Sequence, residues 1–176
     1  MKKIIIGDKA PEFTLPDTTG KEHSLADYPG KVVAVIFSCN HCPYVRAWED
    51  RMVDIQADYA DKNVHILAIN SNDARTYPAD SYTNMKRRVE EKGFNFPYLR
   101  DETQDVARMF GAERTPEVFL FNEDDILAYH GAIDDNYDNP EGVGEHYLRD
   151  ALDALLSGSS PDPVETKPVG CTIKWK

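Results

Sequence analysis

The sequence predicts an α/β fold in which a central mixed sheet is flanked by helices on both faces. Apolar runs at residues 31–38 and 64–69 are each followed by a segment of helical periodicity, as in parallel strands joined by helices. Two later runs, at 117–121 and 126–130, flank a polar turn too short for a crossover helix, which predicts an antiparallel hairpin. The chain of 176 residues has the length of one domain.

The first strand and helix should form the centre of this arrangement. Residues 31–38, KVVAVIFS, show no polar alternation, which indicates a strand covered on both faces. Pro43 suits the first turn of a helix, where its missing N–H would have no partner. A helix is expected over residues 43–60, because apolar side chains recur at spacings of three and four, at Val45, Trp48, Met52, Ile55 and Tyr59.

The remaining elements follow in chain order. Residues 64–69, VHILAI, predict a second buried strand, and the helix after it should end near Gly93. A capping box within residues 101–104 predicts a short helix, which is followed by the hairpin. A last amphipathic helix is expected between Pro140 and Gly158.

Composition separates the last part of the chain from the rest. Residues 1–157 carry the predicted strands and helices and are expected to form the domain. The segment SGSSPDPVETKPVG has the composition of a linker. Residues 158–176 are therefore predicted to be a C-terminal tail that packs on or near the domain.

Charge and hydropathy narrow the partners and the compartment. With 20 Lys and Arg against 31 Asp and Glu, the formal charge of -11 disfavours nucleic acid and anionic membrane surfaces. The apolar start MKKIIIGD ends too early for a signal peptide, and the run at 32–37 is far too short to span a membrane. We expect a cytoplasmic protein without a membrane or nucleic-acid partner.

Two cysteines stand between the central strand and its helix, at Cys39 and Cys42. In a reducing compartment they favour redox or metal chemistry over a structural disulfide. Cys39 is expected at the helix N-terminus, where the dipole favours a thiolate. Cys42, about one turn on, should attack a mixed disulfide formed on Cys39. His41 either stabilises the thiolate as a cation or is an exposed loop residue.

Three stretches resemble a known family: the strand-CxxC-helix unit, the N-terminal segment GDKAPEFTLPDTTGK and the later RTPEVFLF. They are similar to the thioredoxin-like superfamily, in its branch of alkyl hydroperoxide reductases and thiol-specific antioxidants, over roughly residues 4–157. The resemblance implies a cis-proline at Pro116 that faces the cysteine pair, and a client-docking edge at Thr115. It implies no cofactor.

The chain departs from the thioredoxin pattern in two places. Val33 stands where many thioredoxins carry a buried acid, and Ser38 replaces the tryptophan before the first cysteine. The usual base for proton transfer is therefore missing. His41, water or Glu117 could replace it, and the sequence does not choose among them.

Two rival functions remain open. A peroxiredoxin-like peroxidase would need a threonine or serine three residues before its reactive cysteine, where Ile36 precedes Cys39, although Arg114 and Arg46 lie near places where an arginine could serve. A zinc or copper module would need further ligands beside the CxxC pair. His41, Cys171, His130 and His65 are the candidates for such ligands.

Cys171, near the end of the tail, has three interpretations. It is a candidate third redox thiol that reaches the active site on a flexible connection, a buried sulfur in a packed tail, or the site of an intermolecular disulfide. We expect a thiol-disulfide oxidoreductase with the dithiol Cys39/Cys42. Its partners would be a disulfide-bearing client protein or small thiol and an unidentified upstream electron donor.

Overall fold

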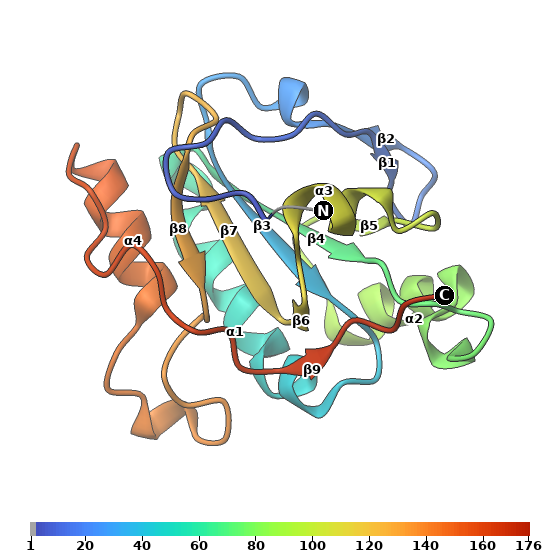
Figure 1. Ribbon diagram of the computed structural model, residues 1–176. Coiled ribbons are helices and arrows are strands. Elements are labelled where there is room, and N and C mark those ends of the chain that lie inside the picture. Colours follow the sequence, from blue (N-terminus) through green and yellow to red (C-terminus); the bar gives the residue numbers. More distant parts are fainter. Residues whose placement is uncertain (1–2) are drawn as a thin grey trace.

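The computed structural model describes residues 3–176, and its centre is a five-stranded mixed sheet (Figure 1). The strands lie in the order β5-β4-β3-β7-β8, with β3 at Val32–Ser38, β4 at Val64–Asn70, β5 at Tyr98–Arg100, β7 at Glu117–Phe121 and β8 at Leu127–Gly131. β3, β4 and β5 are parallel, β7 pairs antiparallel with β3, and β8 pairs antiparallel with β7. The predicted mixed sheet and hairpin are both confirmed.

The helices cover both faces of the sheet, as the sequence predicts. They are α1 at Pro43–Tyr59, α2 at Tyr82–Lys92, α3 at Asp105–Phe110 and α4 at Tyr147–Leu156. Successive side chains of a strand point to opposite faces. Ala34 and Ile36 of β3 therefore pack with α1, α2 and α4, whereas Val35 and Phe37 pack with α3 and the N-terminal segment.

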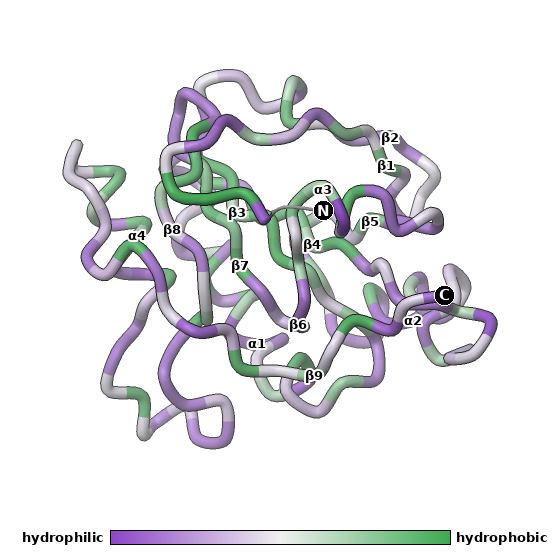
Figure 2. The backbone as a smooth tube through the Cα atoms, viewed as in Figure 1, coloured by the Kyte–Doolittle hydropathy of each residue, from purple (hydrophilic) through white to green (hydrophobic). Residues whose placement is uncertain are grey.

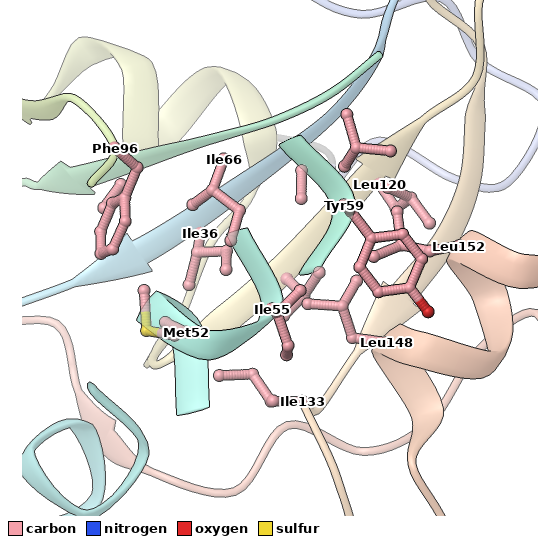
Figure 3. Packing of buried hydrophobic residues seen from close by; sticks show 14 of the residues in the cluster. Ile36, Met52, Ile55, Tyr59, Ile66, Phe96, Leu120, Ile133, Leu148 and Leu152 are labelled. Carbon is pink, nitrogen blue, oxygen red and sulfur yellow. The ribbon is translucent and has the colours of Figure 1, made fainter. Parts of the chain in front are cut away.

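The larger core lies between the sheet and α1, where the predicted apolar stripe of that helix is buried. Figure 3 shows Met52 and Ile55 of α1 against Ile36 and Ile66 of the sheet, with Leu148 and Leu152 of α4 beside them. Along the backbone the apolar residues follow the central strands, and the outer loops are hydrophilic (Figure 2). This burial fixes the position at which β3 passes into α1.

An aromatic cluster fills the other face. Phe110 of α3 meets Phe13, Phe37 and Phe119 edge-on, with ring centroids 5.8, 5.3 and 5.2 Å away. Edge-to-face packing at such distances adds to the stabilisation from burial alone. α3 is therefore fixed beneath the strand that leads to the cysteines.

Two helix starts differ from the predictions. α4 begins at Tyr147, because residues after Asn139 first form a short 3-10 turn at Pro140–Gly142. The capping box predicted for α3 is absent, since Gln104 adopts φ 68° and makes no side-chain cap. Asp101 serves instead, with its carboxylate accepting the N–H groups of Val106 and Ala107 at 3.3 and 3.0 Å.

Two small sheets stand apart from the central one. β1 at Leu15–Pro16 pairs with β2 at Glu22–His23, and β6 at Arg114–Thr115 pairs with β9 at Cys171–Thr172. β9 belongs to the C-terminal tail, which runs past α1 and β6 in Figure 1. Among residues 3–176, every helix is too short or too polar to cross a bilayer.

Candidate active site

The two CxxC cysteines lie at the junction of β3 and α1. Cys39 directly follows the last residue of β3, and Cys42 is the N-cap of α1, with Pro43 as the first helical residue. The sequence analysis placed Cys39 at the helix N-terminus. The structure corrects this, because the N-cap of α1 is Cys42 and Cys39 lies three residues before it.

Thr115 lies against both sulfurs. Its hydroxyl is 3.6 Å from Cys39 Sγ, and its carbonyl oxygen is 3.5 Å from Cys42 Sγ, where it accepts a hydrogen bond whenever that sulfur is protonated. The Thr115–Pro116 peptide bond is cis. The fold thus brings together three of the residues singled out in the sequence, Cys39 and Cys42 at the β3–α1 junction and Thr115 of β6.

Both sulfurs are shielded from water. Cys39 is 2% exposed and Cys42 is fully buried, with Tyr44 and Cys171 packed against them. A molecule that reacts with either sulfur must therefore displace part of this packing. The pair is a covered dithiol, in contrast to an open surface motif.

When the reduced dithiol loses one proton, the negative charge lies on Cys42. A hydrogen bond from the Cys39 thiol lowers the pKa of Cys42 strongly, and donors from Cys171 and the Val45 N–H add to this, while burial acts in the opposite direction. The pKa of Cys39 is raised because it donates that hydrogen bond, because it is buried and because Asp80 is nearby. The helix N-terminus and neighbouring thiols therefore favour one thiolate at the second cysteine.

His41 is held by a carboxylate. Its Nδ1 lies 2.5 Å from Asp80 Oδ2, and its ring stacks on Tyr77 with centroids 6.0 Å apart. The ring nitrogen and the Cys39 sulfur are within 4.8 Å of each other. The tuning of the thiols by His41 stays a prediction, but the residue has a fixed partner and is not a free loop side chain.

Asp80 is a site residue that the sequence analysis missed. It is fully buried at the end of the 3-10 turn Pro78–Asp80, and it accepts hydrogen bonds from Asn40 N–H at 2.7 Å and from Asn70 and Asn72 side chains at 3.1 Å each. The signal available was indirect. Asn70 ends β4, which is parallel to β3, and Asn72 follows two residues later, so both strands place polar residues at the same end of the sheet.

Cys171 lies beside the pair, opposite Thr115 in the β6–β9 ladder. Burial and the neighbouring Cys42 raise the pKa of Cys171 to about 11, so it is a thiol that donates to the Cys42 sulfur. Its side chain is only partly buried. The three sulfurs therefore form one cluster with Cys42 in contact with the other two.

Other candidates from the sequence serve the fold. Glu117 accepts the N–H groups of Glu113 and Arg114 at 2.9 Å and pairs with His130 Nε2 at 2.6 Å. These contacts engage the carboxylate away from the sulfurs, so it is a poor base for the dithiol. His65 packs on Tyr28, with ring centroids 4.9 Å apart.

The arginines that a peroxidase would need are also engaged elsewhere. Arg46 Nε donates to the carbonyl of Asn40 at 3.0 Å, and Arg114 reaches the carbonyl of Gly170 at 3.5 Å. Within residues 3–176 neither guanidinium is hydrogen-bonded to a cysteine sulfur. Ile36, at the position of the peroxide-binding hydroxyl, is fully buried in the core.

Three residues of the site have ligand atoms close enough to share a metal ion. Atoms of Cys39, His41 and Asp80 lie within 4.8 Å of one another. The Asp80 carboxylate already accepts hydrogen bonds from Asn40 and Asn72 and contacts His41. An ion would have to compete with these contacts, which favours the redox interpretation of the pair.

Comparison with known proteins places this site in context. A model of the AhpC/TSA family matches residues 6–130. Thiol-disulfide oxidoreductase ResA of Geobacillus thermodenitrificans is 29% identical over 120 residues, which is 68% of this chain and 65% of that protein. A putative peroxiredoxin of Mycobacterium tuberculosis is 33% identical over 110 residues, 62% of this chain and 66% of that protein.

Solved structures agree on the fold. A hypothetical protein from Sinorhizobium meliloti is 36% identical with a TM-score of 0.93, covering 99% of this chain and 97% of that one. A putative thioredoxin from Neisseria meningitidis is 28% identical with a TM-score of 0.61, covering 70% of this chain and 79% of that one. The fold is therefore thioredoxin-like, as the resemblance implied.

Proposed function

The chain belongs to the AhpC/TSA family, and on that premise we propose that it is a thiol-disulfide oxidoreductase with Cys39 and Cys42 as its redox couple. The observation that carries the proposal is the covered dithiol beside Thr115 and a cis-proline, with hydrogen bonds that hold one thiolate. The similarity to ResA supports the same activity, although this chain spans 65% of the length of that relative.

The reaction begins at Cys39. When a client disulfide RSSR′ approaches, the Cys39 thiol passes its proton to the Cys42 thiolate along the hydrogen bond between them, and the Cys39 sulfur attacks. A Cys39–SR mixed disulfide forms and R′S⁻ leaves. R′S⁻ takes the proton from Cys42, whose sulfur then attacks Cys39 and expels RS⁻. The client gains two electrons, the Cys39–Cys42 disulfide forms, and Cys42 acts as the missing base.

Thr115 is the proposed docking residue and Pro116 its rigid neighbour. A proline has no N–H to offer, so a client that replaces the tail strand β9 at this edge would make its polar contacts with the main chain of Thr115. His41 is proposed to adjust the thiols through Asp80. We propose disulfide-bearing proteins or small disulfides as clients, and a thiol-based donor that reduces the couple again in the cytoplasm.

The assignment is tested by replacing each cysteine. Cys39→Ser should abolish reduction of insulin by a dithiol donor, whereas Cys42→Ser should accumulate a mixed disulfide on Cys39 that mass spectrometry detects. Hydrogen peroxide consumption is measured in parallel. Unchanged insulin reduction in both variants, or rapid saturable peroxide turnover without insulin reduction, would defeat the proposal in favour of a peroxidase.

A further inference from the structure

The proposed docking edge is occupied by the protein's own tail. Thr115 pairs with Cys171 and Arg114 pairs with Thr172, so β9 lies on β6 as an extended client peptide would (Figure 1). The fit is close at Gly170, where an added Cβ would lie 2.0 Å from the Thr115 carbonyl oxygen. Only glycine allows the tail to approach this edge, which indicates a built contact.

The tail is also anchored beyond the cysteine. Ile173 is 3% exposed in the aromatic core, and its N–H donates to the carbonyl of Glu113 at 3.0 Å. The Lys174 carbonyl accepts from Asp73 N–H at 2.7 Å and from the Gln104 amide at 2.9 Å. These contacts hold Cys171 beside the dithiol, so it does not depend on a flexible arm to arrive there.

Cys42 lies between the other two cysteines, and this arrangement gives Cys171 a chemical role. Cys39, Cys42 and Cys171 pack together, and both other cysteines contribute to lowering the pKa of Cys42, whereas Cys171 is influenced by Cys42 and not by Cys39. Cys171 is the partly exposed member, while Cys39 and Cys42 are buried. Thiol-disulfide exchange through Cys171 could therefore connect the buried pair with a reductant at the surface.

We propose that Cys171 is the exit thiol of the couple, which accepts the disulfide from Cys42 and presents it to the upstream reductant. This inference rests on the proposed function. In the step, the Cys171 sulfur attacks the Cys42 sulfur of the Cys39–Cys42 disulfide, the Cys42–Cys171 bond forms, and Cys39 leaves with the proton that Cys171 loses. No net electrons move. A dithiol reductant then attacks the partly exposed Cys171 sulfur and restores all three thiols.

The electrostatics order the steps. In the reduced protein the charge on Cys42 and burial keep Cys171 protonated, since both raise its pKa. Oxidation of the pair removes that charge, which makes the Cys171 thiolate easier to form. Cys171 therefore stays a protonated thiol while Cys39 and Cys42 are reduced. It can attack Cys42 once those two cysteines form a disulfide.

Tryptic mapping of the full-length protein distinguishes the two disulfides. Cys39 and Cys42 fall in one peptide, residues 32–46, and Cys171 falls in another, residues 150–174. The protein is oxidised with limiting diamide, quenched in acid and alkylated. We expect the two peptides to be cross-linked in the wild type and unlinked in Cys171→Ser, which should retain the disulfide within 32–46.

Single-cysteine removals test the order of the sulfurs. Cys39→Ser should form the Cys42–Cys171 bond at least about tenfold faster than Cys42→Ser forms Cys39–Cys171, because Cys42 is the middle sulfur. Adding Gly170→Ala to Cys39→Ser should slow the link by at least about tenfold, whereas the exposed neighbour change Val169→Ala should not. Circular dichroism checks that each variant is folded.

The outcomes separate this inference from the proposed function. If wild type and Cys171→Ser both reduce insulin but Cys39→Ser gives no link, the exit-thiol role is wrong and the oxidoreductase assignment stands. Equal linking rates in Cys39→Ser and Cys42→Ser would also overturn it. If no variant or wild type reduces insulin while the Cys42–Cys171 link forms, the proposed function fails independently.

Discussion

The main-chain N–H of Asn40, between the two cysteines, donates a hydrogen bond to the buried carboxylate of Asp80 at 2.7 Å. The same carboxylate contacts His41, the other residue of the CxxC loop. One side chain from the segment after β4 therefore fixes the loop that carries the sulfurs. It also places a negative charge where Cys39 must ionise.

Asp80→Asn is predicted to make Cys39 more reactive. Donation to Cys42, burial and the Asp80 charge together raise the pKa of Cys39. The variant removes that charge, and its amide oxygen still accepts the Asn40 N–H, but the hydrogen bond from the Asn72 side chain to Oδ2 is lost. The variant should therefore lower the pKa of Cys39, and we expect its thiolate to react about 3- to 10-fold faster. Iodoacetamide labelling of Cys39 at pH 7, followed by mass spectrometry, measures this.

The control for that change is Asp61→Asn, which removes a carboxylate from an exposed position after α1. Its labelling rate should equal that of the wild type. If Cys39 in Asp80→Asn is labelled no faster than in Asp61→Asn, the charge of Asp80 does not govern this thiol.

The reduction potential of the couple should depend only weakly on pH. Hydrogen bonds lower the pKa of Cys42 and raise that of Cys39, so the reduced pair keeps one proton between about pH 5 and 8. For two electrons and one proton the potential falls by about 30 mV per pH unit, against about 59 mV with two protons. Titration in dithiol buffers at several pH values gives the slope.

The stability of the reduced protein should also depend on pH. The depressed pKa of Cys42 in the folded protein stabilises the reduced form above the ordinary thiol pKa, and this contribution is lost as pH falls through the lowered value. The free energy of unfolding of the reduced form should therefore decrease on acidification relative to the oxidised form. A slope near 59 mV throughout that range would show that both thiols are protonated.

Ile173→Ala is predicted to loosen the tail and to destabilise the domain. Ile173 is 3% exposed among the residues of the α3 core, and removal of such a side chain costs about 2–5 kcal/mol of unfolding free energy. Val169→Ala, at a position 43% exposed, should change it by less than about 0.5 kcal/mol. Urea unfolding compares the two, and equal midpoints would mean that the tail adds nothing to the core.

Metal analysis of the protein purified under reducing conditions is expected to find no stoichiometric zinc or copper. Asp80 is engaged by protein donors, and Cys42 is buried and packed against the other two cysteines. One ion per chain in the wild type, lost in Cys39→Ser, would instead support the metal-binding alternative.

Periodicity and apolar runs were enough to predict the central strands and α1. The runs at 31–38 and 64–69 are buried on both faces, so their pattern has few alternative explanations. The cysteine spacing and Thr115-Pro116 similarly led to residues that meet in the structure. The start of α1 at Pro43 was also predicted, but the sequence could not show which cysteine carries the first charge, because that depends on contacts with Cys171 and Asp80.

The rest of the site depends on tertiary contacts. Asp80 and Asn40 are ordinary loop residues in the sequence, and only the pairing of β3 with β4 brings them together. The strand Cys171–Thr172 is too short and too close to a linker-like segment to be predicted. Its position follows from the gap that Gly170 leaves beside Thr115.

The shielding of Cys39 and Cys42 has a consequence for survival under oxidative stress. Peroxide converts an accessible thiolate first to a sulfenic and then to an irreversible sulfinic acid, and each conversion needs the oxidant to touch sulfur. Here two of the three sulfurs are 2% and 0% exposed. The protein should thus retain its dithiol in conditions that permanently damage proteins with open reactive cysteines.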